Sequence, residues 1–230
     1  MKKYVFFTLS ILSMMLFIAC SKDDAETIYI DKTEITLYHG RTYVLKIHGN
    51  SEQPTFVSEN PLIASVNANG VVTGKCIGET EILVKANNHV AKCKINIIPK
   101  INFIPDPYLG FGEPYEKVKN VVTNKDRENI IKVTSNDNSI AIVRSVDRSN
   151  FVYGYFLKNG VLTSVNILLN TIKDFHSVES LLEYVSERYY PIEEINSNMF
   201  GFVSPNKKTI VIVNNERNML QIGFAPVTKK

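Results

Sequence analysis

The spacing of apolar residues between Ile28 and Ile98 is the feature that most constrains the fold of this chain. These residues occur in short runs that Gly, Asn and Pro interrupt, and no stretch keeps a helical period over a useful length. Asn69-Gly70 suits a tight hairpin turn because both residues tolerate a positive φ, and Asn87-Asn88 separates two further alternating runs. Roughly seven strands in about 70 residues predict a small all-β sandwich.

Beyond residue 108 two helical stripes alternate with groups of strands. Gly112-Glu113-Pro114 opens the first helix, because proline suits a first helical turn and glutamate suits its positive end. Ser177 has the side chain of an N-cap for the second helix, which Pro191 ends. The apolar stripes of the two helices consist of Tyr115, Val118, Val121 and Val122, and of Val178, Leu181, Leu182, Val185 and Tyr189.

Strand-like runs accompany these helices, four before the second helix and three after it. Asn159-Gly160, between two of the runs, is a strong signal for a type I′ hairpin turn. The order helix, four strands, helix, three strands predicts an α+β domain built from two weakly similar copies of one unit. We expect two helices on one face of an antiparallel sheet of about seven strands. The runs are 129–135, 139–146, 151–158, 161–169, 199–204, 209–214 and 219–224.

Three prolines between residues 99 and 107 mark a semi-rigid connector between the two patterns. The sequence therefore divides into a leader at 1–19, a tether at 20–27, an all-β domain at 28–98, the connector at 99–107 and an α+β domain at 108–230. Because the two domains differ in hydrophobic period, we expect each of them to fold on its own.

Two cysteines, Cys76 and Cys93, lie within the all-β domain. A two-residue turn at Asn87-Asn88 would pair Ala86 with His89, and would therefore pair Ile82 with Cys93. Cys76 would then lie about 20 Å from Cys93 along the strand, whereas a disulfide needs Cα atoms within roughly 7 Å. We expect two buried, unpaired thiols.

The first 19 residues have the form of a secretory signal, in which Lys2 and Lys3 precede roughly 15 apolar residues. Such a stretch is shorter than the ~20 residues that a membrane-spanning helix needs. It ends in Leu16-Phe17-Ile18-Ala19-Cys20, which resembles the lipobox of bacterial lipoproteins. The resemblance implies cleavage before Cys20 and lipidation at that residue, so that a diacylglycerol group and an acyl chain anchor the protein to a membrane.

Ser21-Lys22-Asp23-Asp24 follows the cysteine and resembles the acidic export tag of surface lipoproteins in some diderm bacteria. We therefore expect a lipid-anchored outer-membrane protein at the cell surface, with a periplasm-facing anchor as the alternative. The chain has 26 Lys and Arg against 23 Asp and Glu, and two of the lysines lie in the leader. This balance gives no reason to expect binding to nucleic acid.

A set of glycines and apolar residues in the all-β domain resembles the group 2 bacterial immunoglobulin-like domain. The resemblance covers about a third of the chain, and Phe56 stands where the family usually has Trp. It implies an immunoglobulin-like sandwich that serves as a spacer or binding module, with no catalytic residue. The matching residues are Gly40, Phe56-Val57-Ser58-Glu59-Asn60, Ile63-Ala64-Ser65-Val66, Asn69-Gly70-Val71-Val72-Thr73-Gly74, Gly78 and Ile82.

Leu109-Gly110-Phe111-Gly112, before a helix that carries Val118, resembles two families through the order of elements. These are the β-lactamase-inhibitor-protein-like fold and the small lipoproteins of outer-membrane assembly. The resemblance implies an interaction domain and transfers no site residue.

Residues able to carry chemistry are few and poorly arranged for catalysis. His176 lies near Asp174 and Ser177, but all three fall at a helix entry, where capping explains the serine. The remaining histidines, His39, His48 and His89, lack the paired spacing of a zinc site.

Two acidic stretches also have simple structural interpretations. Asn136-Asp137-Asn138 lacks the glycine and distal glutamate of a calcium loop and predicts a hairpin turn. Glu193-Glu194 follows Pro191 and is expected as solvated charge on a loop, because no second acid pair frames a substrate. We therefore expect no enzyme, metal or cofactor.

Aromatic residues leave one question open. Phe151, Tyr153 and Tyr155 share one face of a predicted strand, which is either the core face or an open binding face. Tyr153 and Tyr155 are accordingly candidate ligand-binding residues. The sequence supports two hypotheses: a lipoprotein that presents a protein-interaction domain, or an accessory glycan-binding lipoprotein in polysaccharide utilisation or adhesion. A stripe of exposed aromatics would favour glycan, and a flat polar face would favour protein.

Overall fold

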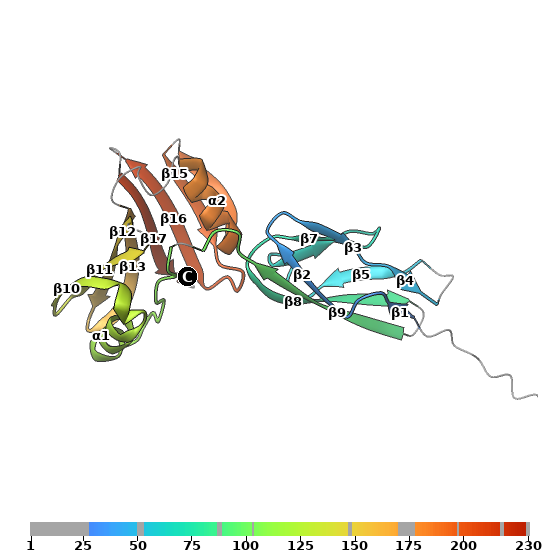
Figure 1. Cartoon of the computed structure of the whole chain (residues 1–230), viewed down its shortest axis with the longest axis horizontal. Coiled ribbons are helices and arrows are strands. Elements are labelled where there is room, and N and C mark those ends of the chain that lie inside the picture. The colour runs from blue at the N-terminus through green and yellow to red at the C-terminus, as the bar shows by residue number, and fades with distance from the viewer. Residues whose placement is uncertain are drawn as a thin grey trace, which may run out of the picture.

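The computed structural model describes residues 28–49, 53–86, 89–102, 104–146, 149–169, 178–196, 198–216 and 219–228. These residues are mostly β, with two α-helices and several sheets, which confirms the β-rich character expected from the sequence. Figure 1 shows two units one after the other along the long axis. Each has its own cluster of buried apolar residues. We name them the N-terminal unit (28–98) and the C-terminal unit (101–228).

The N-terminal unit contains nine strands in sheets of two, four and three strands. The orders are β1-β4, β2-β9-β8-β5 and β3-β7-β6, and β2 runs parallel to β9 while the other pairs are antiparallel. The strands are β1 (Tyr29–Ile30), β2 (Glu34–Tyr38), β3 (Thr42–Val44), β4 (Ile47–His48), β5 (Thr55–Ser58), β6 (Ala64–Val66), β7 (Val71–Gly74), β8 (Gly78–Ala86) and β9 (His89–Ile98).

The long hairpin of β8 and β9 has the register that the sequence predicts. Ala86 pairs with His89 and Ile82 pairs with Cys93. Because side chains alternate along each strand, this register turns Ile82 and Cys93 inward, where both are fully buried.

Gly70 closes the loop between β6 and β7 with φ +73°. A Cβ on this residue would lie 2.8 Å from Cζ of Phe56 and 3.0 Å from the carbonyl oxygen of Leu45. The aromatic ring therefore packs directly on the backbone of the turn. Asn69 does not share the positive φ expected for it.

The C-terminal unit contains one eight-stranded sheet in which all neighbouring strands are antiparallel. The order is β10-β11-β12-β13-β17-β16-β15-β14, so each helix is followed by four strands and the two groups meet at the β13–β17 pair. The elements are α1 (Tyr115–Asn124), the 3-10 helix η1 (Arg127–Asn129), β10 (Ile130–Asn136), β11 (Ser139–Val146), β12 (Ser149–Lys158), β13 (Val161–Leu169), α2 (Val178–Arg188), β14 (Tyr190–Asn196), β15 (Met199–Val203), β16 (Thr209–Glu216) and β17 (Met219–Pro226).

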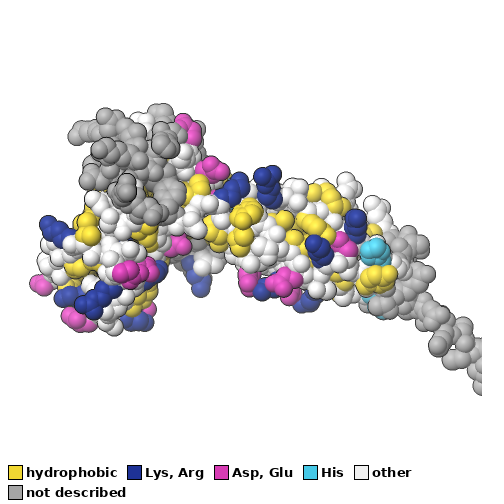
Figure 2. Space-filling view, viewed as in Figure 1, with side chains coloured by type: hydrophobic (Ala, Val, Ile, Leu, Met, Phe, Trp, Pro, Cys, Tyr) yellow, Lys and Arg dark blue, Asp and Glu magenta, His cyan; other side chains and the backbone are white. Residues whose placement is uncertain are grey.

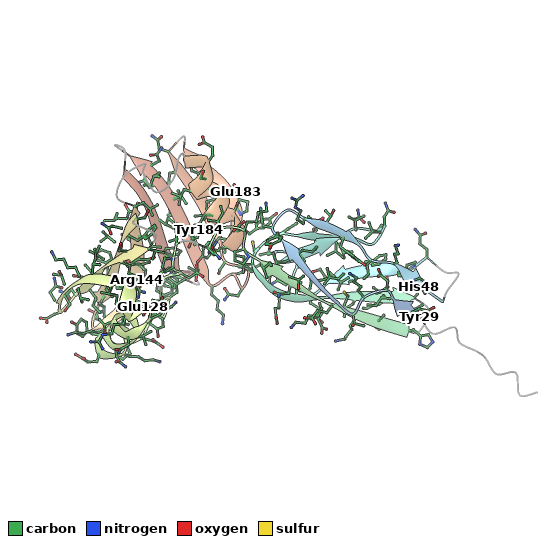
Figure 3. The ribbon with its side chains drawn as sticks, in the orientation of Figure 1. Tyr29, His48, Glu128, Arg144, Glu183 and Tyr184 are labelled. Atoms are coloured by element: carbon green, nitrogen blue, oxygen red, sulfur yellow. The ribbon has the colours of Figure 1, made fainter. Side chains whose placement is uncertain are left out.

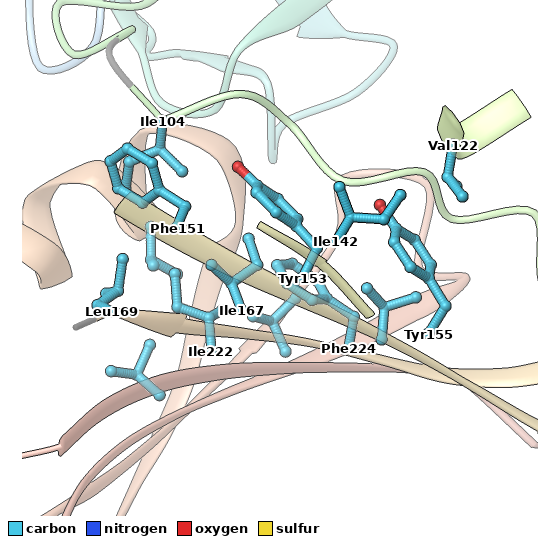
Figure 4. Packing of buried hydrophobic residues seen from close by; sticks show 14 of the residues in the cluster. Ile104, Val122, Ile142, Phe151, Tyr153, Tyr155, Ile167, Leu169, Ile222 and Phe224 are labelled. Atoms are coloured by element: carbon cyan, nitrogen blue, oxygen red, sulfur yellow. The ribbon is translucent and has the colours of Figure 1, made fainter. Parts of the chain in front are cut away.

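Both helices cover the same face of this sheet. Val118 of α1 and Leu181 of α2 belong to one buried cluster with side chains from six strands. Ile104, in the segment expected to be a connector, is 1% exposed and belongs to the same cluster. Figure 4 shows this segment crossing above the strand that carries Phe151, Tyr153 and Tyr155. The described residues 101–102 and 104–107 therefore form part of the layer that covers the sheet as well as joining the two units.

The strand β14 corrects one sequence prediction. Glu193 and Glu194 were expected on a loop, but their backbone lies in β14 and pairs with Gly201 and Phe200 of β15. Pro191 stops α2 as predicted and then takes part in the strand. Proline is tolerated because β14 is an edge strand, where a missing N–H group costs no ladder hydrogen bond.

The two units meet where α2 ends. The side chain of Glu187 is fully buried and accepts the backbone N–H groups of Lys100 at 3.1 Å and Ile101 at 3.0 Å. The backbone carbonyl oxygen of Glu187 accepts the N–H of Ile77, from the N-terminal unit, at 2.6 Å. Arg188 follows and pairs with Asp106 at 2.9 Å. The last turn of α2 therefore bonds both to the connecting segment and to the N-terminal unit.

Candidate interaction surface

From β11 to β15, the middle of the sheet face that the helices do not cover is formed by uncharged residues, many of them small. The register places one row across the middle of this face, from β11 to β15. Glycine recurs in this row, so the backbone is close to the surface there. The row is Ala141, Gly154, Asn166, Gly223, Ile212 and Gly201.

A second row contains the largest apolar side chains of this open face. Phe156 of β12 is 42% exposed, and Ile210 of β16 is 37% exposed. Ser164 and Ala225 occupy the two strands between them, so small side chains separate two apolar positions. The Phe156 ring lies beside Gly154, with Cε2 3.0 Å from the position that a Cβ there would take.

The third row completes the central part of the open face, and its side chains are aliphatic or amides. It runs Val143, Val152, Leu168, Gln221, Asn214 and Met199. The Oδ1 atom of Asn214 is buried and has no hydrogen-bond partner. None of the three rows contains Asp, Glu, Lys or Arg. We define the open face by these three rows.

Tyr153 and Tyr155 lie on the opposite face, in the core, with 1% and 2% of their surface exposed. The sequence allowed either a core face or an open binding face for these residues, and the structure places them on the core face. Figure 4 shows both rings pointing from β12 toward the covering layer. The Tyr153 hydroxyl donates to the carbonyl oxygen of Pro105 at 2.7 Å, and burial raises the pKa of both phenols. They face inward because β12 turns its odd-numbered residues toward the helices.

The other candidate residues are dispersed or lie outside the described residues. Cys20 and the group Asp174, His176 and Ser177 fall outside them. His48 stacks on Tyr29 with ring centroids 5.1 Å apart, at the end of the N-terminal unit away from the C-terminal unit (Figure 3).

The other two described histidines are also in the N-terminal unit. His39 contacts the carbonyl oxygen of Lys75, and His89 begins β9. Within the described part of the chain, no three His, Cys, Asp or Glu side chains gather in a way that could hold a metal ion.

Cys76 and Cys93 are both buried free thiols in the described N-terminal unit. Burial raises the pKa of each thiol to about 11. A thiol that stays protonated at neutral pH is a poor nucleophile, so both residues act as small apolar side chains of the core.

One buried cation escaped the sequence analysis. Arg144 of β11 is 3% exposed on the helix side, where its guanidinium contacts the Asp126 carboxylate at 3.1 Å and the Val122 carbonyl oxygen at 3.1 Å. It continues the series of buried positions in β11 that Ile140 and Ile142 begin, and Figure 3 shows it near Glu128 of η1. The sequence shows a charged residue at an otherwise apolar position of this strand, but it does not show the partner, Asp126, which directly precedes η1.

A hollow of about 610 Å³ lies on the helix side at one end of the sheet. The 109–111 loop, the end of α2, the β15–β16 turn and the end of β17 form its walls. Its lining is mainly apolar, with Tyr189 half-buried against Phe224 at a ring separation of 5.8 Å. The titratable residues in its described lining are Tyr189, Lys207 and Lys208, and that lining contains no Asp, Glu or His.

Comparisons with known proteins add little at this level of similarity. No family model matches the chain, and no curated protein matches it. Among solved structures it is similar to domains 1–6 of the surface layer protein SbsC, with 15% identity, 89% of this chain covered and a TM-score of 0.27. Domains 5–6 of the same protein give 15% identity, 89% coverage and a TM-score of 0.26.

The chain spans 25% of the first of these structures and 98% of the second. Similarities of this size carry no argument about fold or activity. In the described part of the chain, no helix has the length and apolarity needed to cross a membrane.

Proposed function

We propose that this chain is a non-enzymatic cell-envelope lipoprotein whose C-terminal unit binds a protein partner. Cys20 carries the lipid, and the chain is anchored at the outer membrane, at the cell surface or facing the periplasm. The N-terminal unit is a spacer of the group 2 bacterial immunoglobulin-like type. The C-terminal unit is an α+β interaction domain. Support for the anchor comes from the Leu16–Cys20 motif, and support for the spacer comes from the glycine and apolar residues quoted above.

The observation that carries the proposal is the open face of the eight-stranded sheet. Its three rows are free of charge, and Phe156, Ile210 and Ile212 each expose more than a third of their surface. Protein interfaces have cores that are depleted in charged residues, and a partner can cover such a face without desolvating an unpaired charge. The apolar positions are scattered among Ser, Asn and Gly, so the face also remains soluble when it is uncovered.

Glycan binding is the weaker candidate. Sugars are held by exposed aromatic rings, and Phe156 is the only aromatic residue in the three rows of the open face. A stripe of exposed aromatic residues would favour glycan over protein as the ligand. Tyr153 and Tyr155 would have to belong to that stripe, and both are buried. A glycan array with the soluble chain tests this alternative directly. Binding of one glycan class, lost on changing Phe156 to Ser, would favour it over a protein partner.

Capture from envelope extracts tests the proposal. The bait is the chain from residue 21 on, compared with Ile212→Lys and Ser164→Arg variants that place charge on the open face. We expect both variants to lose the captured partner while keeping the wild-type melting temperature. Val44→Lys is the matched control, because Val44 is 53% exposed on the N-terminal unit. Equal capture by all variants would contradict the proposal, as would turnover of an envelope polymer that one substitution abolishes.

A further inference from the structure

The two edges of the eight-stranded sheet differ in how well they are protected against pairing with another strand. The edge strand β14 contains Pro191, and its pairing with β15 is interrupted by two register shifts. Proline and bulges are the common means by which proteins block an edge. The other edge strand, β10, has seven residues, no proline and one register shift, between Ile130 and Lys132.

The side chains of β10 are exposed to an unusual degree for a strand in a large sheet. All residues after Ile130 are exposed, including Ile131 at 59% and Val133 at 42%. Because β10 pairs only with β11, half of its backbone N–H and C=O groups point away from the sheet. Lys132 is the one charged residue in the strand. The edge is therefore available for main-chain hydrogen bonds to an added strand.

A hollow of about 340 Å³ runs beside β10 on the helix side of the sheet. Val133 faces this side, because its partner in the register, Ile142, is buried beneath the helices. The hollow is lined by Thr123, Asn124, Arg127, Ile130 and Val133, which come from α1, η1 and β10. A ninth strand next to β10 would send every second side chain toward this hollow.

The charge of the hollow comes from Arg127. Two acids flank Arg127: Asp126 is engaged by the guanidinium of Arg144 at 3.1 Å, and Glu128 follows in η1. Lys132 pairs with Val143 and therefore lies on the open face, on the other side of the sheet from the hollow. Figure 2 shows charges of both signs near α1 and β10. Arg127 can therefore bind a carboxylate from the added strand, which arginine does with two parallel hydrogen bonds.

We propose that β10 binds an extended segment of a partner protein as a ninth strand, with one Glu or Asp side chain of that segment at Arg127. This inference rests on the proposed function and names the form of the partner. A segment matching β10 is roughly 23 Å long at ~3.3 Å per residue. Pairing over that length buries far less than the ~1,600 Å² of a standard interface, which fits a peptide better than a stable dimer of this chain.

Fluorescence anisotropy with a labelled synthetic peptide tests the proposal. The probe has the same seven-residue length as β10 and alternates valine with threonine around a central glutamate. We expect it to bind the chain from residue 21 on, and Ile131→Lys to weaken binding about tenfold by adding a charge at the edge. Ile192→Lys is the matched control, since Ile192 is 56% exposed on the blocked edge strand β14.

A charge exchange tests the role of Arg127. Arg127→Glu should abolish binding of the glutamate peptide and restore binding of a peptide with lysine at its centre. Arg41→Glu, on the exposed surface of the N-terminal unit, should change neither result. Amide hydrogen exchange should show new protection in residues 130–136 when the glutamate peptide is present.

Three results would overturn the inference. The first is equal weakening by Ile131→Lys and Ile192→Lys, and the second is absence of binding by the peptide. The third is a concentration-dependent dimer that Ile131→Lys abolishes, which would make a second copy the occupant. If envelope capture survives Ile131→Lys but not Ile212→Lys, the proposed function stands and the role of β10 fails.

Discussion

Glu187 accepts the backbone N–H of Lys100 at 3.1 Å through Oε1, although 87 positions of sequence separate the two residues. Oε2 of the same carboxylate accepts the N–H of Ile101 at 3.0 Å. A fully buried carboxylate is costly unless each oxygen is hydrogen-bonded, and here two backbone donors meet that need. The contact holds the start of the connecting segment against the last turn of α2.

Replacing Glu187 with Ala should therefore destabilise the C-terminal unit. The change leaves two N–H groups without acceptors and opens a cavity, and we expect a loss of about 2–4 kcal/mol. Chemical denaturation checks this. Glu183→Ala is the matched control, because Glu183 lies one turn earlier in α2, and its side chain is 53% exposed and 3.8 Å from Lys100. The control should cost about 0–1 kcal/mol, and equal losses would contradict the role of Glu187.

Asp126→Asn should measure how much the ion pair between Asp126 and Arg144 contributes to the free energy of unfolding. Asp126 has φ +48°, a conformation that asparagine also tolerates, so the backbone should be unaffected. The substitution removes the charge that faces the buried guanidinium, and we expect a loss of about 1–3 kcal/mol. Asp137→Asn, in the exposed turn between β10 and β11, should have no measurable effect. Thermal unfolding of both variants checks this prediction. Identical melting temperatures for Asp126→Asn and Asp137→Asn would refute it.

Stability should fall in alkali because of the two buried thiols. Burial raises the pKa of Cys76 and Cys93 from 9.0 to about 11. Below pH 9 both states keep these protons. Between about pH 9 and pH 11 the unfolded chain loses them more readily, so the free energy of unfolding decreases as pH rises. Denaturation across this range should show the slope, and the Cys76→Ala, Cys93→Ala double variant should show less of it.

Gly70→Ala should be more costly than Gly40→Ala. Both glycines have φ +73°, so both substitutions strain the backbone by a similar amount. Only at Gly70 would the new methyl group meet other atoms, with Phe56 Cζ at 2.8 Å, whereas nothing lies within 4 Å at Gly40. We expect a difference of about 1–3 kcal/mol in the free energy of unfolding. A Gly40 variant as unstable as the Gly70 variant would show that packing against Phe56 is not the cause.

Cys20→Ser should abolish lipidation, since the lipobox motif requires the thiol. The variant should accumulate as a precursor and move from the detergent phase to the aqueous phase on partitioning. Labelling with a fatty-acid analogue provides the direct readout. Incorporation that persists in the Cys20→Ser variant would remove the proposed anchor.

Local sequence signals located several elements to the residue. The strands Ser139–Val146 and Val161–Leu169 have the predicted bounds, and α2 begins directly after Ser177 as expected. Asn159 and Gly160 both have positive φ, as the type I′ turn requires. Alternation and turn chemistry determine such features within a few residues of chain, so no tertiary information is needed.

The same local signals failed where a residue's role depends on distant neighbours. Pro191 and the acidic pair after it suggested a loop, because the sequence does not show that this segment is a sheet edge. Ile104 was assigned to a connector, although it lies in the core of the C-terminal unit. Glu187 lies outside the apolar stripe predicted for the second helix, and only the approach of Lys100 and Ile101 makes its burial possible.

The sequence by itself determined the β-rich character of the chain, the places of both helices, the β8–β9 register and the burial of Cys93. Each follows from periodicity or from a turn, which are properties of neighbouring residues. Only the tertiary structure decided which face of β12 is covered, and hence that Tyr153 and Tyr155 are core residues while Phe156 is exposed. Alternation separates the two faces of a strand, but the helices and the segment that carries Ile101 and Ile104 determine which face loses contact with water.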